Sequence, residues 1–252
     1  MSVHSFQSVY KLRLDQSTKP FNARGSKVQR CAKCAVALQF CLCQYKVVIG
    51  SEARFMVLLS QNEVFKPSNT GRLIGDIFPN SQYFQWQRTQ APQALLDVLN
   101  HSDFFPVLIF PDHYAQKSNS MKLAVKNELP RHKKPLFILL DGSWREARRM
   151  YHQSPYLHDL PLLSFTPQQI SQYQMRKSDN LNHLSTVEVA SLCLEWFGEE
   201  KQAQCLQHWF AVFRESYLLS RSQGRGNIER EQLRLFSAHY QRHSGRVVSE
   251  DG

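Results

Sequence analysis

Short apolar segments alternate with helical patterns between residues 54 and 165, and this alternation constrains the fold more than any other feature. The apolar runs are too short for buried helices and predict strands, while amphipathic stretches between them predict helices. Such alternation is typical of parallel βαβ units in an α/β domain. We expect strands at 54–59, 82–86, 104–110, 135–140 and 160–165, and helices ending near Ile77, at 92–100, at 120–129 and from Trp144.

The two ends of the chain have a different character. Residues 1–30 carry six cations against the single acid Asp15, and we expect a loosely ordered or RNA-contacting basic arm. After residue 183 the pattern predicts helices alone, at about 185–197, 200–220 and 227–241, with a hinge at "SRSQGRGN". The predicted organisation is a basic arm (1–30), a cysteine-rich segment (31–50), an α/β domain (51–197) and a helical extension with a basic tail (198–252).

Composition narrows the class of protein. The chain has 252 residues, 42% of them hydrophobic, and no apolar run approaches the roughly 18 residues of a membrane span. The N-terminus lacks the apolar core of a signal peptide, so we expect a cytoplasmic protein without a membrane partner. The formal net charge of +10 favours a polyanion such as RNA or DNA, and the alternative is a basic surface without a specific role.

Four of the six cysteines cluster in "CAKCAVALQFCLC" with the spacing C-x2-C-x6-C-x-C. Two close pairs of thiolates can surround one tetrahedral metal ion, and four protein ligands leave no open position, so Cys31, Cys34, Cys41 and Cys43 predict a structural zinc site. Lys46 would lie near its negative charge. The alternatives are a chance cluster of free thiols or a redox pair, and the pattern does not separate zinc from iron.

Polar residues follow the predicted strands, where ligands of open α/β sheets bind. The strand at 135–140 runs directly into Asp141 and Gly142. A carboxylate at the edge of a sheet is partly desolvated, which raises its pKa and suits a general base. The alternative for Asp141 is a carboxylate that only accepts backbone hydrogen bonds. Gly142 predicts a tight turn or a close approach of backbone to a ligand.

The helix after this strand begins with Ser143 and Trp144. Ser143 has Glu146 three residues on, the spacing of a capping box, and Ser185 with Glu188 repeats it. Trp144 belongs either to the core or to a surface that stacks on a nucleobase.

Basic residues occur in the helix that begins at Trp144 and in the polar segment 69–72. Arg145, Arg148 and Arg149 share one face of the predicted helix, which is either an ordinary solvated face or a track for phosphates. The segment Asn69-Thr70-Gly71-Arg72 leads into another helix and predicts either a plain helix start or a ligand loop.

In this order and spacing, the motifs resemble the DTW-domain family, the transfer-RNA uridine aminocarboxypropyltransferases. The resemblance covers about residues 31–195 and is carried by "CAKCAVALQFCLC", "EVFKPSNTGRLI", "FPD", "LLDGSWREARRM", "SPYLHDLPLL" and "MRKSDNLNHLSTVE". It implies a SPOUT-like parallel sheet with flanking helices, of a type that can be knotted. It also implies transfer of the 3-amino-3-carboxypropyl group from S-adenosylmethionine to N3 of a uridine in tRNA.

The family's motifs map onto particular residues of this chain. Its Asp-x-Thr-Trp motif falls on residues 141–144, which implies catalytic roles for Asp141, Ser143 and Trp144. Its donor-binding segments fall on Asn69, Thr70, Gly71, Gly142, Ser185, Thr186 and Glu188. Charge alone adds candidate RNA contacts at Arg72, Arg145, Arg148, Arg149, Arg176 and Lys177, of which the last two could instead bind the donor's carboxylate.

Two residues depart from the family pattern. Ser143 replaces a threonine and keeps its hydroxyl, and Ser60 stands where many members have a histidine, which puts the target or the rate in question. The competing hypotheses are a SPOUT-type RNA methyltransferase, a zinc-stabilised RNA-binding paralogue without catalysis and, less well supported, a DNA-binding factor, for which the chain shows no helix-turn-helix pattern. The sequence does not specify the target uridine or the oligomeric state.

Overall fold

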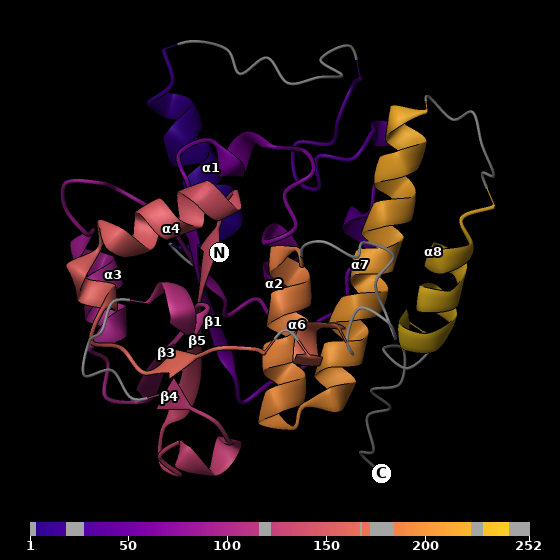
Figure 1. Cartoon of the computed structure of the whole chain (residues 1–252). Helices are drawn as coiled ribbons and strands as arrows, with labels where there is room; N and C mark the ends of the chain where they lie inside the picture. Colours follow the sequence, from indigo (N-terminus) through magenta and orange to yellow (C-terminus); the bar gives the residue numbers. More distant parts are fainter. Residues whose placement is uncertain are drawn as a thin grey trace, which may run out of the picture.

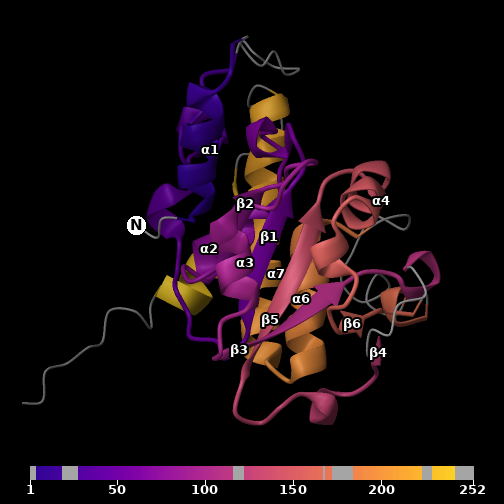
Figure 2. The same ribbon diagram turned by 90° about the vertical axis from the view of Figure 1, so that its left-hand side faces the viewer.

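A computed structural model describes residues 4–18, 28–115, 122–166, 168–171, 184–222 and 229–241. Its centre is a six-stranded sheet with the order β2-β1-β5-β3-β6-β4, in which every neighbouring pair is parallel (Figures 1 and 2). The strands are β1 (Arg54–Leu59), β2 (Gln82–Gln85), β3 (Phe104–Ile109), β4 (Lys122–Leu123), β5 (Lys134–Asp141) and β6 (Leu162–Leu163). The predicted α/β class with a parallel sheet is confirmed.

Helices cover both faces of the sheet because successive strand residues point to opposite sides. Phe55 and Val57 of β1 belong to one buried cluster, together with residues of α2 (Arg72–Ile77), α6 (Thr186–Phe197) and α7 (Glu200–Arg221). Met56 and Leu58 belong to a second cluster, together with residues of α3 (Gln93–Leu99) and α4 (Trp144–His152). Figure 1 shows α6 and α7 on one side of the sheet, and α3 and α4 on the other.

The N-terminal residues fold onto the sheet. Helix α1 (Phe6–Asp15) buries Phe6 and Val9, and the Phe6 ring meets Tyr83 of β2 edge to face at 5.6 Å. The Tyr83 amide also donates a hydrogen bond to the carbonyl of His4 at 2.8 Å. The first alternative for the basic arm, a loosely ordered segment, is therefore wrong for residues 4–18, and the second, an RNA contact, stays a prediction. Residues 19–27 lie outside the described part.

The C-terminal helices are confirmed, and α7 is a core element. Its Leu206 and Trp209 are fully buried in the cluster that packs on the sheet. The predicted last helix appears as α8 (Glu231–Phe236), followed by a π-helical turn, η7 (Ser237–Gln241). Cys193 and Cys205 are fully buried, as expected of core cysteines. The domain boundaries stay predictions.

Two predicted elements differ from the structure. The helix expected at 120–129 is wrong, because its described residues contain the short strand β4 and a 3-10 turn, η5 (Lys126–Glu128). The last strand is shorter than expected and pairs only at Leu162 and Leu163. Among the described helices, none is both long and apolar enough to cross a bilayer.

Candidate active site and metal centre

Three distant segments meet at the carboxyl ends of β1 and β5. Leu59 pairs with Asp141 in the parallel ladder, and the Ser60 amide donates to the Asp141 carbonyl at 2.8 Å. The two oxygens of the Asp141 carboxylate then accept one hydrogen bond each: Oδ2 from Asn69 Nδ2 at 2.7 Å, and Oδ1 from Thr186 Oγ1 at 2.5 Å. Asp141 thus ties the loop before α2 to the start of α6.

Asp141 is almost fully buried, with only 3% of its surface exposed. Burial raises its pKa from 3.8 to about 6, and the negative charge of Glu63 acts in the same direction. The hydrogen bonds from Thr186 and Asn69 oppose the shift without cancelling it. The expected desolvation of Asp141 is confirmed, and a group with this pKa can change protonation near the pH of the cell.

Glu63 belongs to the same cluster and was not among the predicted site residues. It is buried, its Oε1 accepts from Asn69 Nδ2 at 3.4 Å, and its Oε2 pairs with Lys66 Nζ at 2.5 Å. The one feature of the sequence that could have indicated a role for Glu63 is its position as an acid in the polar loop that follows the first strand. Its closeness to Asp141 depends on how that loop folds back.

Both predicted capping boxes are present. At the start of α4, the Glu146 carboxylate accepts from the amide and hydroxyl of Ser143 at 2.8 and 2.6 Å. At the start of α6, Glu188 accepts from the amide and hydroxyl of Ser185 at 2.8 and 2.7 Å. The capping role of these serines is confirmed, whereas their roles in catalysis and donor binding stay predictions.

Two glycines allow backbone and side chain to come close at this junction. A Cβ atom on Gly71 would lie 2.5 Å from Asp141 Oδ2, and one on Gly142 would lie 2.9 Å from Ser60 Oγ. Gly71 has ordinary helical dihedral angles, so space and not conformation demands glycine there. Ser60 is fully buried under this turn, and a hydrogen bond from its side chain helps to lower the pKa of Glu146 in the first turn of α4.

Gly71→Ala is expected to lower the free energy of unfolding by ~1–3 kcal/mol, the usual cost of overpacking, because Asp141 must move away from the added methyl group. Gly50→Ala is the matched control, since a Cβ atom on Gly50 would have no other atom within 4 Å. Thermal unfolding of both variants checks this. Equal melting temperatures would contradict the close packing of Gly71 on Asp141.

Aromatic side chains lie close together where α4 begins after β5, next to the turn that follows β3. Trp144 is 40% exposed, its ring stacks on Phe110 at 5.6 Å, and Tyr114 meets it edge to face at 5.0 Å. The Arg148 guanidinium lies 4.6 Å from the centre of the Tyr114 ring. We call Trp144, Tyr114 and Arg148 the aromatic surface; Phe110 is buried behind it. The structure thus places Trp144 at the surface of the protein, and Tyr114 is a neighbour that the sequence did not indicate.

The predicted RNA contacts fall into three groups. Arg145, Arg148 and Arg149 are exposed on α4, where a polyanion can reach them. Arg72 is wrong as an RNA contact, because its side chain is 5% exposed and donates to the carbonyl of Pro67 at 2.8 Å inside the protein. Arg176 and Lys177 lie outside the described residues.

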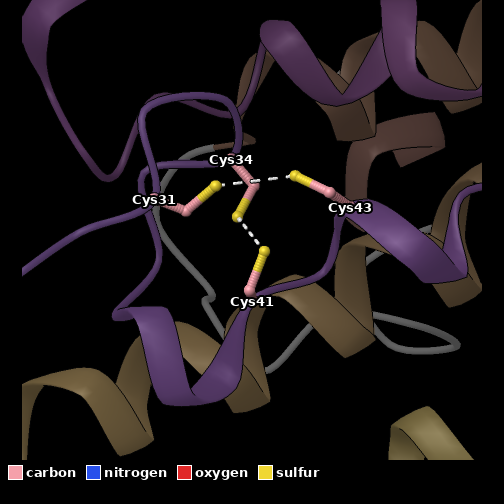
Figure 3. Close-up of side chains that lie close together, drawn as sticks. All are labelled: Cys31, Cys34, Cys41 and Cys43. Atoms are coloured by element: carbon pink, nitrogen blue, oxygen red, sulfur yellow. Dashed lines mark hydrogen bonds between the residues drawn. The ribbon is translucent and has the colours of Figure 1, made fainter.

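The four clustered cysteines converge as predicted (Figure 3). Their Sγ atoms all lie within 4.8 Å of one another, with Cys31–Cys43 at 3.6 Å and Cys34–Cys41 at 3.8 Å. Sulfurs at zinc–sulfur distances of ~2.3 Å in a tetrahedron lie about 3.8 Å apart, whereas a disulfide requires ~2.05 Å. The cluster therefore fits one tetrahedral metal ion, for which the four thiols supply a complete ligand set.

The thiols of this cluster are unequal without a metal ion. Burial raises the pKa of Cys34 and Cys43. Burial acts the same way on Cys31, but hydrogen bonds outweigh it and lower the pKa of Cys31 to about 6. They come from the backbone of Cys34 and Lys33 and from the side chains of Cys41 and Cys43. A cation would bring all four to the thiolate form, so metal binding should release protons.

Comparison with known proteins places these features in a family. A family model described as "DTW domain" matches residues 28–218, which include the four cysteines, Asp141 and most of α7. Over 57 residues the chain is 39% identical to the Drosophila melanogaster protein named tRNA-uridine aminocarboxypropyltransferase 2, a match that covers 23% of each chain. No solved structure matches significantly. Because the family model spans most of its length, the chain belongs to the DTW-domain family.

Proposed function

We propose that this protein transfers the 3-amino-3-carboxypropyl group of S-adenosylmethionine to N3 of a uridine in tRNA. The observation that carries the proposal is the buried Asp141, with a pKa of about 6, joined to Asn69 and Thr186 at the ends of two parallel strands. Membership of the DTW-domain family supports it, as does the name of the Drosophila relative. Ligands of open α/β sheets bind at this edge.

The donor would bind where the loop before α2 approaches the start of α6. Asn69, Thr70 and Gly71 come from the loop, Ser185, Thr186 and Glu188 from the helix start, and Gly142 from the turn after β5. Asp141 connects the first two groups, so their spacing depends on its hydrogen bonds. A SPOUT-like arrangement of these segments, including a knot, stays a prediction.

The reaction forms one bond and breaks one bond. Uridine N3 loses its proton and attacks the γ-carbon of the methionine moiety, and the bond from that carbon to the sulfonium sulfur breaks with its electrons moving to sulfur. The products are the modified uridine, methylthioadenosine and the released proton. Asp141 is our candidate for the group that receives this proton, and the protein's other task is to present the γ-carbon instead of the methyl carbon.

The RNA would lie across α4. Arg145, Arg148 and Arg149 are exposed there, and the aromatic surface offers the Trp144 ring to an unpaired base. Stacking on an aromatic ring combined with arginine–phosphate contacts is a common way to hold single-stranded RNA. Trp144 lies three residues from Asp141 in the chain, so a bound base and the reacting uridine can be near neighbours.

The double variant Arg148→Gln/Arg149→Gln should bind tRNA more weakly and with less dependence on salt. Each lost phosphate contact reduces the slope of log K against log salt by about 0.7–0.9, so two contacts reduce it by about 1.5. Binding titrations at several salt concentrations measure the slope. Arg131→Gln is the control, since Arg131 is exposed in the loop before β5, at the other end of that strand. An unchanged slope in the double variant would remove α4 from the RNA surface.

The function itself is tested by the mass of the product. Purified protein is incubated with S-adenosylmethionine and unmodified tRNA, and the RNA is digested to nucleosides for mass spectrometry. A uridine heavier by one aminocarboxypropyl group is the expected result. A methylated uridine would assign the protein to the methyltransferases, and RNA binding without any new nucleoside would favour the non-catalytic paralogue.

We further propose that the four-cysteine cluster holds a structural Zn²⁺. The complete ligand set supports a structural and not a catalytic ion, since no position is left for substrate. Zinc would fix the segment 31–43, whose local structure is limited to the 3-10 turns η1 (Leu38–Phe40) and η2 (Cys43–Tyr45) and a single β-bridge from Ala37 to Arg30.

A further inference from the structure

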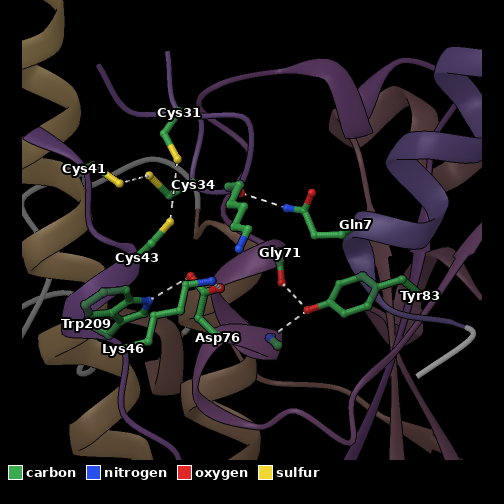
Figure 4. A network of polar contacts seen from close by, with 12 residues as sticks. Gln7, Cys31, Cys34, Cys41, Cys43, Lys46, Gly71, Asp76, Tyr83 and Trp209 are labelled. Atoms are coloured by element: carbon green, nitrogen blue, oxygen red, sulfur yellow. Dashed lines mark hydrogen bonds and ion pairs between the residues drawn. The ribbon is translucent and has the colours of Figure 1, made fainter. Parts of the chain in front are cut away.

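Helix α2 and the loop before it are held together as one unit. Asn69 Oδ1 accepts from the Arg72 amide at 3.0 Å, while Asn69 Nδ2 reaches Asp141. The Tyr83 hydroxyl donates to the Gly71 carbonyl at 3.0 Å and accepts from the Gly75 amide at 2.7 Å (Figure 4). A displacement of α2 would therefore move Asn69 relative to Asp141.

The far end of α2 is tied to the cysteine-rich segment. Asp76 forms an ion pair with Lys46, which follows Cys43 by three residues, and its other oxygen accepts from Trp209 Nε1 at 3.1 Å (Figure 4). The Ile49 amide also donates to the carbonyl of Ile77 at 3.3 Å. One short helix thus contacts the metal-binding segment at one end and the Asp141 junction at the other.

A second cation, Arg72, is buried at the start of α2. Its guanidinium lies 5.0 Å from the centre of the Phe213 ring, and its Nε has no hydrogen-bond partner among the described residues. Burial lowers the pKa of Arg72, and the negative charges of Asp76 and Cys34 act in the opposite direction. A buried cation of this kind needs negative charge nearby.

A metal-bound cluster would supply that charge. A divalent ion held by four thiolates keeps two net negative charges, and Lys46 and Arg72 are two buried or half-buried cations on the side of α2. Asp76 alone neutralises only one of them. The cluster would thus add negative charge beside Lys46 and Arg72, whose surroundings already include Asp76.

We propose that α2 couples the metal centre to the Asp141 junction, with Lys46, Asp76 and Arg72 as positioning residues for the loop 69–71. The link from Lys46 through Asp76 to Asn69 transmits the position of the cysteine-rich segment to the site. That the loop 69–71 binds the donor rests on the function proposed above; the mechanical link does not.

The test is hydrogen exchange on zinc-loaded Lys46→Met, in which the metal ligands are intact. The amides of Arg72 and Gly75 should exchange at least about tenfold faster than in the wild type, because their acceptors are Asn69 and Tyr83 within the coupled unit. Amides of α3, on the other face of the sheet, should be unchanged. Zinc content should stay at one ion per chain, and Lys46→Arg should restore the exchange rates.

Two further measurements separate this inference from the proposed function. Lys201→Met, at an exposed position near the start of α7, should leave every rate unchanged. The dissociation constant for S-adenosylmethionine should rise about tenfold in Lys46→Met and stay unchanged in Lys201→Met. If the wild type binds no donor while the exchange result holds, the proposed function fails and the coupling stands. Unchanged exchange at Arg72 and Gly75 in Lys46→Met, with zinc bound, would overturn the coupling.

Discussion

Asp141→Asn is expected to lose most of the aminocarboxypropyl transfer and yet to be more stable than the wild type at neutral pH. An asparagine can keep both hydrogen bonds, with its oxygen toward Asn69 and its amide toward the Thr186 hydroxyl, but it cannot receive a proton. It also removes a buried negative charge that lies near Glu63. Activity and stability therefore move in opposite directions, as they often do at functional sites.

The pH dependence follows from the direction of the shift. The folded-state pKa of Asp141 is raised to about 6 from 3.8, so its contribution to stability is fully present below pH 3.8 and is lost as the pH rises through about 6. The stability of Asp141→Asn relative to the wild type should grow over that window by about 3 kcal/mol, since one pKa unit corresponds to about 1.4 kcal/mol. Wild-type activity should fall as the pH drops below about 6.

Denaturant unfolding at several pH values on both sides of this window and single-turnover rates of both proteins provide the measurement. Asp112→Asn is the matched control, because Asp112 follows the neighbouring strand β3 but is exposed and paired with Lys122 at 3.2 Å. A near-wild-type rate in Asp141→Asn would reduce Asp141 to a positioning residue that ties Asn69 to Thr186. If the difference in stability between Asp141→Asn and the wild type did not change with pH, the pKa of the Asp141 carboxyl would not be raised in the folded protein.

Cys34→Ser is expected to abolish zinc binding and to lower the free energy of unfolding more than any other substitution proposed for this protein. Cys34 is buried and supplies one of four ligands to a segment without long helices or strands. Binding to a structural site is itself folding free energy. Its loss should cost on the order of 5 kcal/mol, at the upper end of the effects of single substitutions. For a chain of this size that corresponds to a fall in melting temperature of roughly 10–20 °C.

Metal analysis and thermal unfolding of the purified proteins check this. Cys193→Ala is the control, since Cys193 is as fully buried but lies in α6, outside the cluster. It should keep one zinc ion and lose only the modest stability of a small core side chain. Treatment of the wild type with a chelator should reproduce the Cys34→Ser melting temperature. A Cys34→Ser protein that retains zinc would show that the cluster is not the metal site.

Local patterns in the sequence were sufficient for most of the central strands and helices and for the residues that act on their immediate neighbours, but not for α1 or for the segment 122–129. The apolar run at 135–140 predicted β5, and the spacing of Ser143 and Glu146 predicted the cap of α4, because both depend on contacts within a few residues. The four cysteines could be grouped for the same reason, since all of them lie within the short segment 31–43. Each of these patterns lies within a short stretch of sequence, so it can be recognised without knowing the tertiary structure.

The partners of Asp141 were decided only by the tertiary structure. The sheet order places β5 beside β1, although three strands separate them in sequence, and this brings Asn69, Glu63 and Thr186 to one carboxylate. Arg72 shows the converse, because nothing in its surroundings in the sequence distinguishes a buried cation from an exposed one. The spacing of residues in the sequence predicts contacts within one helix or strand. Pairing between strands and the burial of charged side chains depend instead on how distant segments pack together.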